Sequence, residues 1–119
     1  MIGWGPAEEK EAIEIADATG GVLIPATSIR ELTAILEACD LFVGMDTGPM
    51  HLSSLVGTPV VAVFGRSDPV MHGPAEYLPG TVVASPDARE WGRRKRKGLP
   101  PFRDPAPEAV VEAALGLLG

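Results

Sequence analysis

The sequence is poor in cysteine and aromatic residues: Cys39 is the only cysteine among 119 residues, and aromatic residues make up 5%. One cysteine excludes an internal disulfide and argues against a cysteine-based metal cluster. No apolar run approaches the roughly 20 residues of a membrane-spanning helix. The first residues also lack the basic start and the apolar core of a signal peptide. These absences favour a cytoplasmic protein without disulfides.

Hydrophobic residues make up 45% of the sequence, which suits one globular domain. The net charge of −6 is unevenly distributed, because residues 89–97 carry six basic residues and one acidic residue. The acidity of the rest of the chain argues against a nucleic-acid partner. The basic run 93–97 has three readings: a solvated surface segment, a contact with an anionic acceptor or a membrane surface, or a nucleic-acid contact.

Apolar periodicity and breakers alternate between strand and helix along the chain. Helices are predicted to begin near Pro6, Ser28, Pro49 and Pro107, and strands are predicted at 1–3, 22–24, 41–43, 59–64 and 81–84. Ser28 and Glu31 have the spacing of a capping box. The run 41–43 does not alternate, so we expect it to be covered on both faces. The order predicts a parallel α/β sheet with helices on both faces, which binds ligands at the carboxyl ends of its strands.

The turn Asp46-Thr47-Gly48-Pro49 follows the predicted strand 41–43 and opens a helix. Gly48 lets a ligand approach the backbone, Thr47 can cap the helix, and Pro49 presets its first turn. The free amides of that turn form an anion site, for which phosphate is the natural occupant. Asp46 is suited to accept from neighbouring amides or to bind a hydroxyl group, and His51 to donate to a phosphate oxygen.

A plainer interpretation is that Asp46 and Thr47 only cap the helix and that His51 is a satisfied histidine. A second polar loop, which contains Gly65, Ser67 and Asp68, follows the next predicted strand. Loops that follow neighbouring parallel strands lie side by side. This context favours a phosphate-sugar site over a simple cap.

The segment DLFVGMDTGPMHLSSLVGTPVVAVFGRSDP resembles the signature region of glycosyltransferase family nine, the ADP-heptose–lipopolysaccharide heptosyltransferases. Upstream, Gly5-Pro6-Ala7-Glu8 resembles the Gly-Pro-x-Glu of that family, and 28–32 resembles its Ser-Leu-x-Glu-Leu helix start. Residues 85–106 match poorly, and Arg66 stands where the family usually has proline. The residues that match the signature position by position are Asp46, Thr47, Gly48, Pro49, His51, Gly57, Thr58, Pro59, Phe64, Gly65, Ser67, Asp68 and Pro69.

The resemblance implies a Rossmann-like donor-binding domain over residues 1–119, the C-terminal half of a GT-B glycosyltransferase, with a basic loop at 85–106. The acceptor domain with its catalytic aspartate, and the first strand of the donor domain, are then expected outside this sequence. No catalytic base is expected within it. The missing strand would leave a sheet edge unpaired, so self-association into a homo-oligomer is a further expectation.

The resemblance also implies roles for single residues. Asp46, Thr47, Gly48 and Pro49 would contact the diphosphate and sugar of the donor, with His51 near the phosphate. Elsewhere, Glu8 would bind the ribose or sugar hydroxyls, Ala26 and Thr27 would line the adenine pocket, and Gly65, Ser67 and Asp68 would form the adjacent loop.

The resemblance implies an ADP-sugar as the donor, with no metal or other cofactor expected. It implies a lipopolysaccharide core at the inner membrane surface as the acceptor. The chain would then be cytoplasmic, or peripheral at that membrane. Two rival interpretations are a non-catalytic nucleotide-sugar binding module and a structural, self-assembling subunit.

Overall fold

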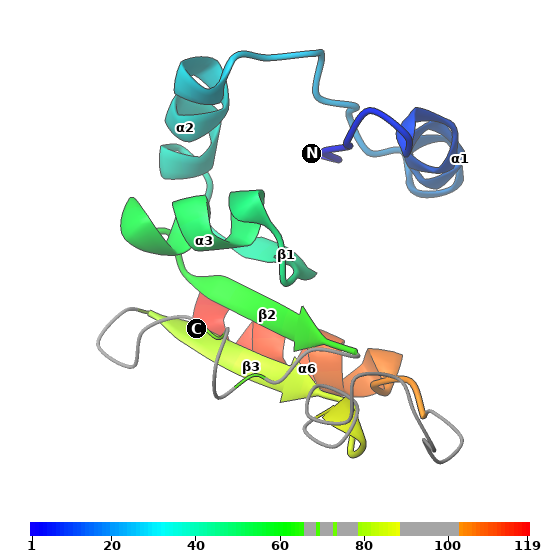
Figure 1. Cartoon of the computed structure of the whole chain (residues 1–119), viewed down its shortest axis with the longest axis vertical. Helices are drawn as coiled ribbons and strands as arrows, with labels where there is room; N and C mark the ends of the chain where they lie inside the picture. The colour runs from blue at the N-terminus through cyan, green and yellow to red at the C-terminus, as the bar shows by residue number, and fades with distance from the viewer. Residues whose placement is uncertain (66–68, 70–72, 74–78, 89–102) are drawn as a thin grey trace, which may run out of the picture. The chain divides into compact units, whose positions relative to one another are not determined.

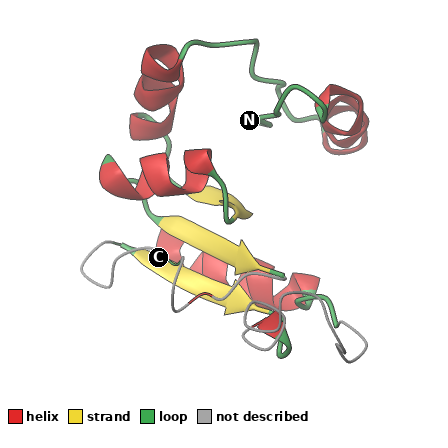
Figure 2. Ribbon diagram, in the orientation of Figure 1, coloured by secondary structure: helices red, strands yellow, loops and turns green. Residues whose placement is uncertain are grey.

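The computed structural model describes residues 1–65, 69, 73, 79–88 and 103–119 (Figure 1). These residues divide into two compact units, Met1–Leu32 and Thr33–Gly119, and each is described by itself. The prediction of a single domain over 1–119 stays a prediction. The elements, drawn by type in Figure 2, are α1 (Glu9–Thr19), α2 (Ile29–Glu37), β1 (Phe42–Met45), α3 (Gly48–Leu55), β2 (Val60–Phe64), β3 (Gly80–Ala84) and α6 (Pro107–Leu118).

The first unit contains α1 and a minimal pair of extended segments. The predicted strands at 1–3 and 22–24 are reduced to one parallel bridge between Ile2 and Leu23. The indole N–H of Trp4 donates to the carbonyl of Ile24 at 2.7 Å and ties the segment after Ile2 to the segment after Leu23. α1 ends at Gly20, whose φ of 70° is the left-handed geometry that glycine adopts without strain.

The predicted capping box at the start of α2 is confirmed. The Ser28 hydroxyl oxygen accepts from the backbone N–H of Glu31 at 3.2 Å, and the Glu31 carboxylate accepts from the backbone N–H of Ser28 at 3.2 Å. The Ser28 hydroxyl also donates to that carboxylate at 2.7 Å. This hydroxyl bond, together with the backbone bond, lowers the pKa of Glu31 below its ordinary value of 4.5. Two donors at the helix start are therefore satisfied by local side chains.

The second unit is built on a parallel sheet with the strand order β1-β2-β3. One face of β2 presents Val60, Ala62 and Phe64, which form the buried core cluster with Met50 of α3. Val61 alternates to the other face and is also fully buried. α6 packs against β2 and β3 and is drawn behind them in Figure 1. The predicted parallel sheet with helices on both faces is therefore confirmed in this unit.

The expectation that the strand at 41–43 is covered on both faces is wrong. β1 spans Phe42–Met45, and its burial alternates: Val43 is 48% exposed and Met45 is 57% exposed. The reason is position: in the described part of the chain, β1 pairs with β2 and with no other strand, and α6 packs against β2 and β3. Phe42 instead packs on the core cluster, and its ring lies so close to Gly44 that a Cβ there would come within 2.6 Å of it.

Within the described part of the chain, no helix combines the length and the apolar character needed to cross a membrane.

Candidate functional site

The three parallel strands end at one edge of the sheet, as the sequence predicts. Asp46 follows β1, Gly65 follows β2 and Ser85 follows β3. The backbone N–H of Ser85 donates to the carbonyl of Phe64 at 2.8 Å, so the exits of β2 and β3 are joined directly. Gly65 is buried. The other predicted members of the second loop, Ser67 and Asp68, lie outside the described residues, as do Arg66 and the basic run 93–97.

α3 begins directly beyond β1, and Thr47 is its N-cap residue with extended backbone angles. The expectation that the Thr47 side chain caps the helix is wrong, because its hydroxyl donates backwards to the carbonyl of Met45 at 3.3 Å. Pro49 lies in the first turn, as predicted, and has no N–H. Gly48 and Met50 therefore supply the backbone N–H groups of the first helical turn that have no partner within the helix.

The space in front of this turn is open at Gly48. A Cβ built on Gly48 would meet no heavy atom within 4 Å, and the residue is exposed. Its backbone is outside the left-handed region, since the positive-φ glycines are Gly20, Gly57 and Gly119. Neither the backbone conformation nor crowding within the described part of the chain therefore requires glycine at position 48. A ligand can therefore come close to the backbone of Gly48 from this side.

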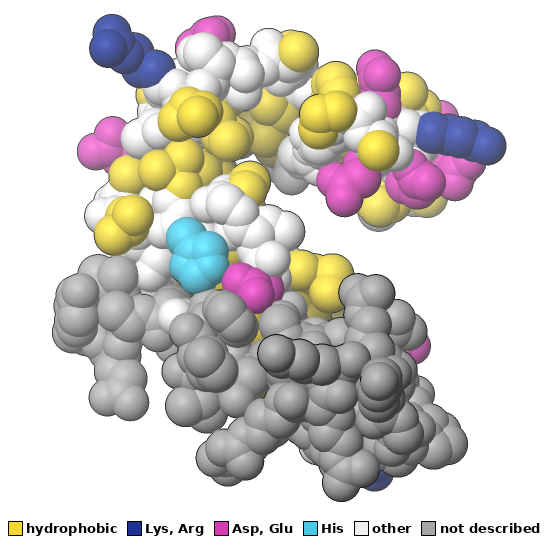
Figure 3. All heavy atoms as spheres, viewed as in Figure 1, with side chains coloured by type: hydrophobic (Ala, Val, Ile, Leu, Met, Phe, Trp, Pro, Cys, Tyr) yellow, Lys and Arg dark blue, Asp and Glu magenta, His cyan; other side chains and the backbone are white. Residues whose placement is uncertain are grey.

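Asp46 and His51 meet across the same turn. Nε2 of His51 lies 3.0 Å from Oδ1 of Asp46, and the two side chains are 45% and 23% exposed respectively. Figure 3 shows a histidine beside an acidic side chain on this surface. The sequence predicted both residues at the site but treated them separately, with Asp46 bound to amides or a hydroxyl group. Asp46 and His51 are five residues apart, a spacing that spans the turn and the first turn of α3. This spacing is the signal that could have indicated the pair.

This pair fixes the imidazole ring. When Nε2–H donates to Asp46, Nδ1 of the neutral ring can only accept, and only the doubly protonated ring donates from both nitrogens. His51 is held further by its backbone, whose N–H donates to the carbonyl of Thr47 at 3.3 Å. A ring that donates to Asp46 from Nε2 can therefore donate to an anion from Nδ1 only when it carries both protons.

The remaining predicted site residues belong to the unit Met1–Leu32. One carboxylate oxygen of Glu8, Oε2, accepts from the backbone N–H of Gly5 at 2.9 Å, while the residue as a whole is exposed. Ala26 is exposed and Thr27 is half-buried in the segment that leads into α2. Glu8 is therefore partly engaged in its own turn through Oε2, and its expected contact with a ribose or sugar hydroxyl stays a prediction.

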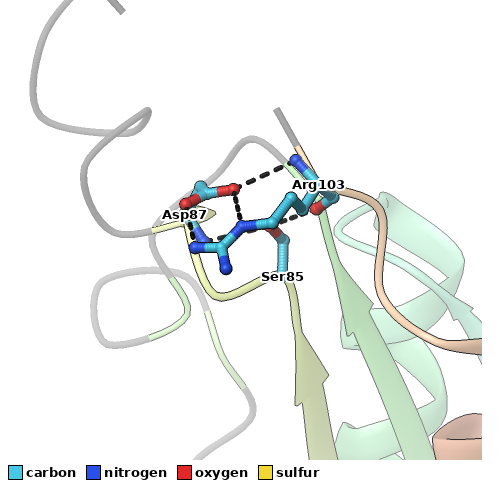
Figure 4. A network of polar contacts seen from close by, with 3 residues as sticks. All are labelled: Ser85, Asp87 and Arg103. Atoms are coloured by element: carbon cyan, nitrogen blue, oxygen red, sulfur yellow. Dashed lines mark hydrogen bonds and ion pairs between the residues drawn. The ribbon is translucent and has the colours of Figure 1, made fainter. Parts of the chain in front are cut away.

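A polar network that sequence reasoning missed lies just beyond β3 (Figure 4). Asp87 is 7% exposed and accepts from the guanidinium of Arg103 at 2.7 Å and 3.0 Å, and from the backbone N–H of Arg103 at 3.0 Å. The hydroxyl of Ser85 donates to the carbonyl of Arg103 and accepts from the N–H of Asp87 at 3.1 Å. The sequence signal for Asp87 was the run Ser-Pro-Asp directly after a predicted strand. Its partner, Arg103, lies 16 residues further along the chain.

This network shifts the ionisation of both charged members. The bidentate hydrogen bonds from Arg103 hold the pKa of Asp87 below its ordinary value of 3.8, and the same bonds raise the pKa of the Arg103 guanidinium. Both groups are therefore charged over the whole neutral range. The ion pair fixes the chain that enters α6 to the exit of β3, at the same edge of the sheet as Asp46 and His51.

Among the described residues, no group of three or more His, Cys, Asp or Glu side chains is arranged to hold a metal ion. The described residues supply helix amides, a histidine–aspartate pair and an arginine–aspartate pair at this edge.

Comparison with known proteins gives consistent results. The family model of glycosyltransferase family 9 (heptosyltransferase) matches residues 1–96. Lipooligosaccharide heptosyltransferase 2 of Campylobacter jejuni is 31% identical over 97 residues, which cover 77% of this chain and 30% of that protein. Lipopolysaccharide heptosyltransferase 3 of Escherichia coli K12 is 32% identical over 75 residues, which cover 59% of this chain and 22% of that protein.

A solved structure agrees with these relatives. The crystal structure of the glycosyl transferase family 9 protein from Veillonella parvula DSM 2008 matches with a TM-score of 0.77 and 26% identity, over 98% of this chain and 35% of that chain. The chain thus spans about a fifth to a third of the lengths of these proteins. The α/β fold and the expected family are both confirmed: the chain belongs to glycosyltransferase family 9.

Proposed function

We propose that this chain is the donor-binding portion of a heptosyltransferase-like glycosyltransferase of the GT-B type. The reaction would transfer a sugar from a nucleoside-diphosphate sugar, with ADP-heptose as the expected donor, to a lipopolysaccharide core at the inner membrane surface. Membership of family 9 and the heptosyltransferase names of its relatives support this proposal. A cytoplasmic location, with peripheral contact at that membrane, is part of the same proposal.

The observation that carries the proposal is the open start of α3. A Cβ built on Gly48 would meet no heavy atom within 4 Å, and Nε2 of His51 lies 3.0 Å from Oδ1 of Asp46 across the same turn. A diphosphate is the group that this arrangement suits, because the amides, the positive end of the helix dipole and a protonated histidine all favour negative charge. Asp46 repels the same phosphates, so its proposed contribution is to orient the ring of His51 through the contact at 3.0 Å.

These groups would also assist the transfer chemically. When the bond from the sugar to the diphosphate breaks, negative charge accumulates on the departing nucleoside diphosphate. Donors that are fixed in advance stabilise such charge better than water, which must reorganise. We assign Gly48, Met50 and His51 to this stabilisation of the leaving group. The proposal places no step on a metal ion or on another cofactor.

The unit Met1–Leu32 would bind the nucleoside. Oε1 of Glu8 is suited to accept from a ribose or sugar hydroxyl, since Oε2 already accepts from Gly5. Ala26 and Thr27 would contact the adenine. A non-catalytic binding module would use these same residues, so transfer is tested separately from binding.

The experiment is calorimetric titration of the chain with ADP, UDP, GDP and their sugars. We expect ADP or an ADP-sugar to bind best, and His51→Gln and Asp46→Asn to weaken it by about tenfold or more, as loss of a hydrogen bond to a charged group predicts. Glu112→Gln on α6 removes one exposed acidic charge away from the site and is the matched control. Unchanged affinity in both site variants would refute the assignment. A sugar-transfer assay with the same donor, on a protein that joins this chain to the expected acceptor domain, then separates an enzyme part from a binding module.

A further inference from the structure

The indole of Trp4 continues the pairing between the two extended segments of the unit Met1–Leu32. These segments form one parallel bridge, between Ile2 and Leu23. The N–H of Ile2 donates to the carbonyl of Val22, and the N–H of Ile24 donates to the carbonyl of Ile2, both at 2.8 Å. In a continued parallel strand, the next donor to Ile24 would be the backbone N–H of Trp4. The donor observed at that carbonyl is the indole N–H of the same residue, at 2.7 Å.

Because a side chain makes this bond, the backbone can leave the extended pair at Trp4 and turn. The N–H of Glu8 donates to the carbonyl of Gly5 at 2.9 Å, and Oε2 of Glu8 accepts from the N–H of Gly5 at 2.9 Å. A Cβ built on Gly5 would lie 3.1 Å from that carboxylate oxygen, so the absence of a side chain lets the carboxylate fold back over the turn. Glu8 is therefore held against the turn that Trp4 opens.

The second extended segment leaves the pair at the same edge. Ile24 is followed after one proline by Ala26 and Thr27, which lead into α2. The carboxyl ends of paired parallel segments lie at one edge, which is where α/β folds bind their ligands. The turn that holds Glu8 follows the first segment at this edge, and Ala26 follows the second. The bond from Trp4 to Ile24 joins these two exits.

We propose that Trp4 is a positioning residue for the nucleoside of the donor, because its indole bond fixes the spacing between Glu8 and the segment of Ala26 and Thr27. This inference rests on the proposed function, in which Glu8 binds a ribose or sugar hydroxyl and the other two residues contact the adenine. Trp4 acts through these residues and needs no contact with the donor. The diphosphate is assigned to the start of α3, so the binding of inorganic pyrophosphate should not depend on Trp4.

Trp4→Phe tests the bond, because it keeps an aromatic ring and removes the indole N–H. The affinity for ADP should fall by about threefold to tenfold, the range expected for the loss of one neutral hydrogen bond, and the affinity for pyrophosphate should stay the same. His51→Gln should weaken both ligands. Thr19→Val is the matched control, because the Thr19 hydroxyl donates to the carbonyl of Ile15 at 2.7 Å in the same unit, at the end of α1, and its loss should change neither affinity.

Both affinities can be measured by calorimetry or, where binding is weak, by ¹⁵N–¹H spectra recorded during the titration. If Trp4→Phe binds ADP as tightly as the unmodified chain, or loses pyrophosphate binding to the same extent as ADP binding, Trp4 is not a positioning residue for the nucleoside, and the proposed site at α3 is unaffected. If the unmodified chain binds neither ligand, the proposed function fails and this inference fails with it. Circular dichroism shows whether each variant is folded.

A second measurement leaves Trp4 in place and so does not depend on the folding of Trp4→Phe. The sequence contains two tryptophans, and Trp91→Phe makes Trp4 the source of the one remaining indole N–H resonance. This resonance should move as ADP is added, saturate at the affinity measured by calorimetry, and stay in place when pyrophosphate is added. An indole resonance that does not move while ADP binds would overturn the inference.

Discussion

Replacement of Gly48 by alanine separates the folding of this chain from its binding of a diphosphate. In the free protein the new Cβ meets no heavy atom within 4 Å, and the backbone of Gly48 is outside the left-handed region. Alanine also restricts the unfolded chain more than glycine does. The free energy of unfolding should therefore stay the same or rise by up to about 1 kcal/mol.

Binding should respond in the opposite direction. The added methyl group would occupy the space from which a phosphate oxygen must approach the N–H of Gly48, at about 2.7–3.2 Å from nitrogen. The loss of one hydrogen bond to a charged group costs about 1.5–3 kcal/mol, which corresponds to a loss of about tenfold to a hundredfold in affinity. The assay is thermal unfolding combined with calorimetric titration of ADP.

Gly116 supplies the matched control for this substitution. It lies in α6, and a Cβ there also meets no heavy atom within 4 Å. Gly116→Ala should raise stability by about 1 kcal/mol, because alanine favours a helix, and leave ADP binding unchanged. The reasoning is refuted if Gly48→Ala folds normally and binds ADP as tightly as the unmodified chain.

Four further substitutions test two buried hydroxyl groups, the capping box and the ion pair of Asp87. Ser54→Ala should stabilise the chain by about 1 kcal/mol in chemical denaturation, because the Ser54 hydroxyl is buried and has no hydrogen-bond partner among the described residues. Thr58→Val should destabilise the chain by a similar amount, because the Thr58 hydroxyl donates to the carbonyl of Leu36 at 2.6 Å. A change of the same sign in both variants would contradict this reasoning. Glu31→Gln should make the free energy of unfolding fall less steeply as the pH is lowered. The folded pKa of Glu31 is below 4.5, so its contribution is present above that pH and is lost as pH falls through the lower folded value, and an unchanged pH profile would count against the capping box. Asp87→Asn should likewise remove stability that is present above pH 3.8, and equal stability of variant and unmodified chain at neutral pH would show that the pair with Arg103 contributes nothing.

The sequence predicted the features of the fold that depend on local periodicity. The buried strand at 59–64, the capping box at Ser28 and the helix that begins at Pro107 were all found close to their predicted bounds. Their signals are short-range: an unbroken apolar run, a capping pair three residues apart, and a proline followed by acidic residues. Such signals need no knowledge of the rest of the chain.

Features that depend on neighbours were predicted poorly. The run Leu41-Phe42-Val43 has the composition of a fully covered strand, but burial is set by what packs against it, and among the described residues β1 pairs with β2 alone. The segment 22–24 has a strand-like composition and forms a single bridge. In both places the missing information was tertiary rather than local.

The candidate site divides in the same way. The turn at 46–49 and His51 could be predicted from residue types and from the family resemblance. Rotamers decide the rest: the Thr47 hydroxyl turns back to Met45, and the Asp46 carboxylate turns to His51. The pair of Asp87 and Arg103 could not be found from spacing, because the chain between them is long and only the folded structure brings them together.

The most direct test of the central claim is a ¹⁵N–¹H spectrum of the labelled chain recorded during a titration with ADP. The claim is that the first amides of α3 hold a diphosphate, and it predicts that the backbone resonances of Gly48 and Met50 move most in the unit Thr33–Gly119 and saturate at the calorimetric affinity. If ADP binds while both of these resonances stay in place, the claim is wrong.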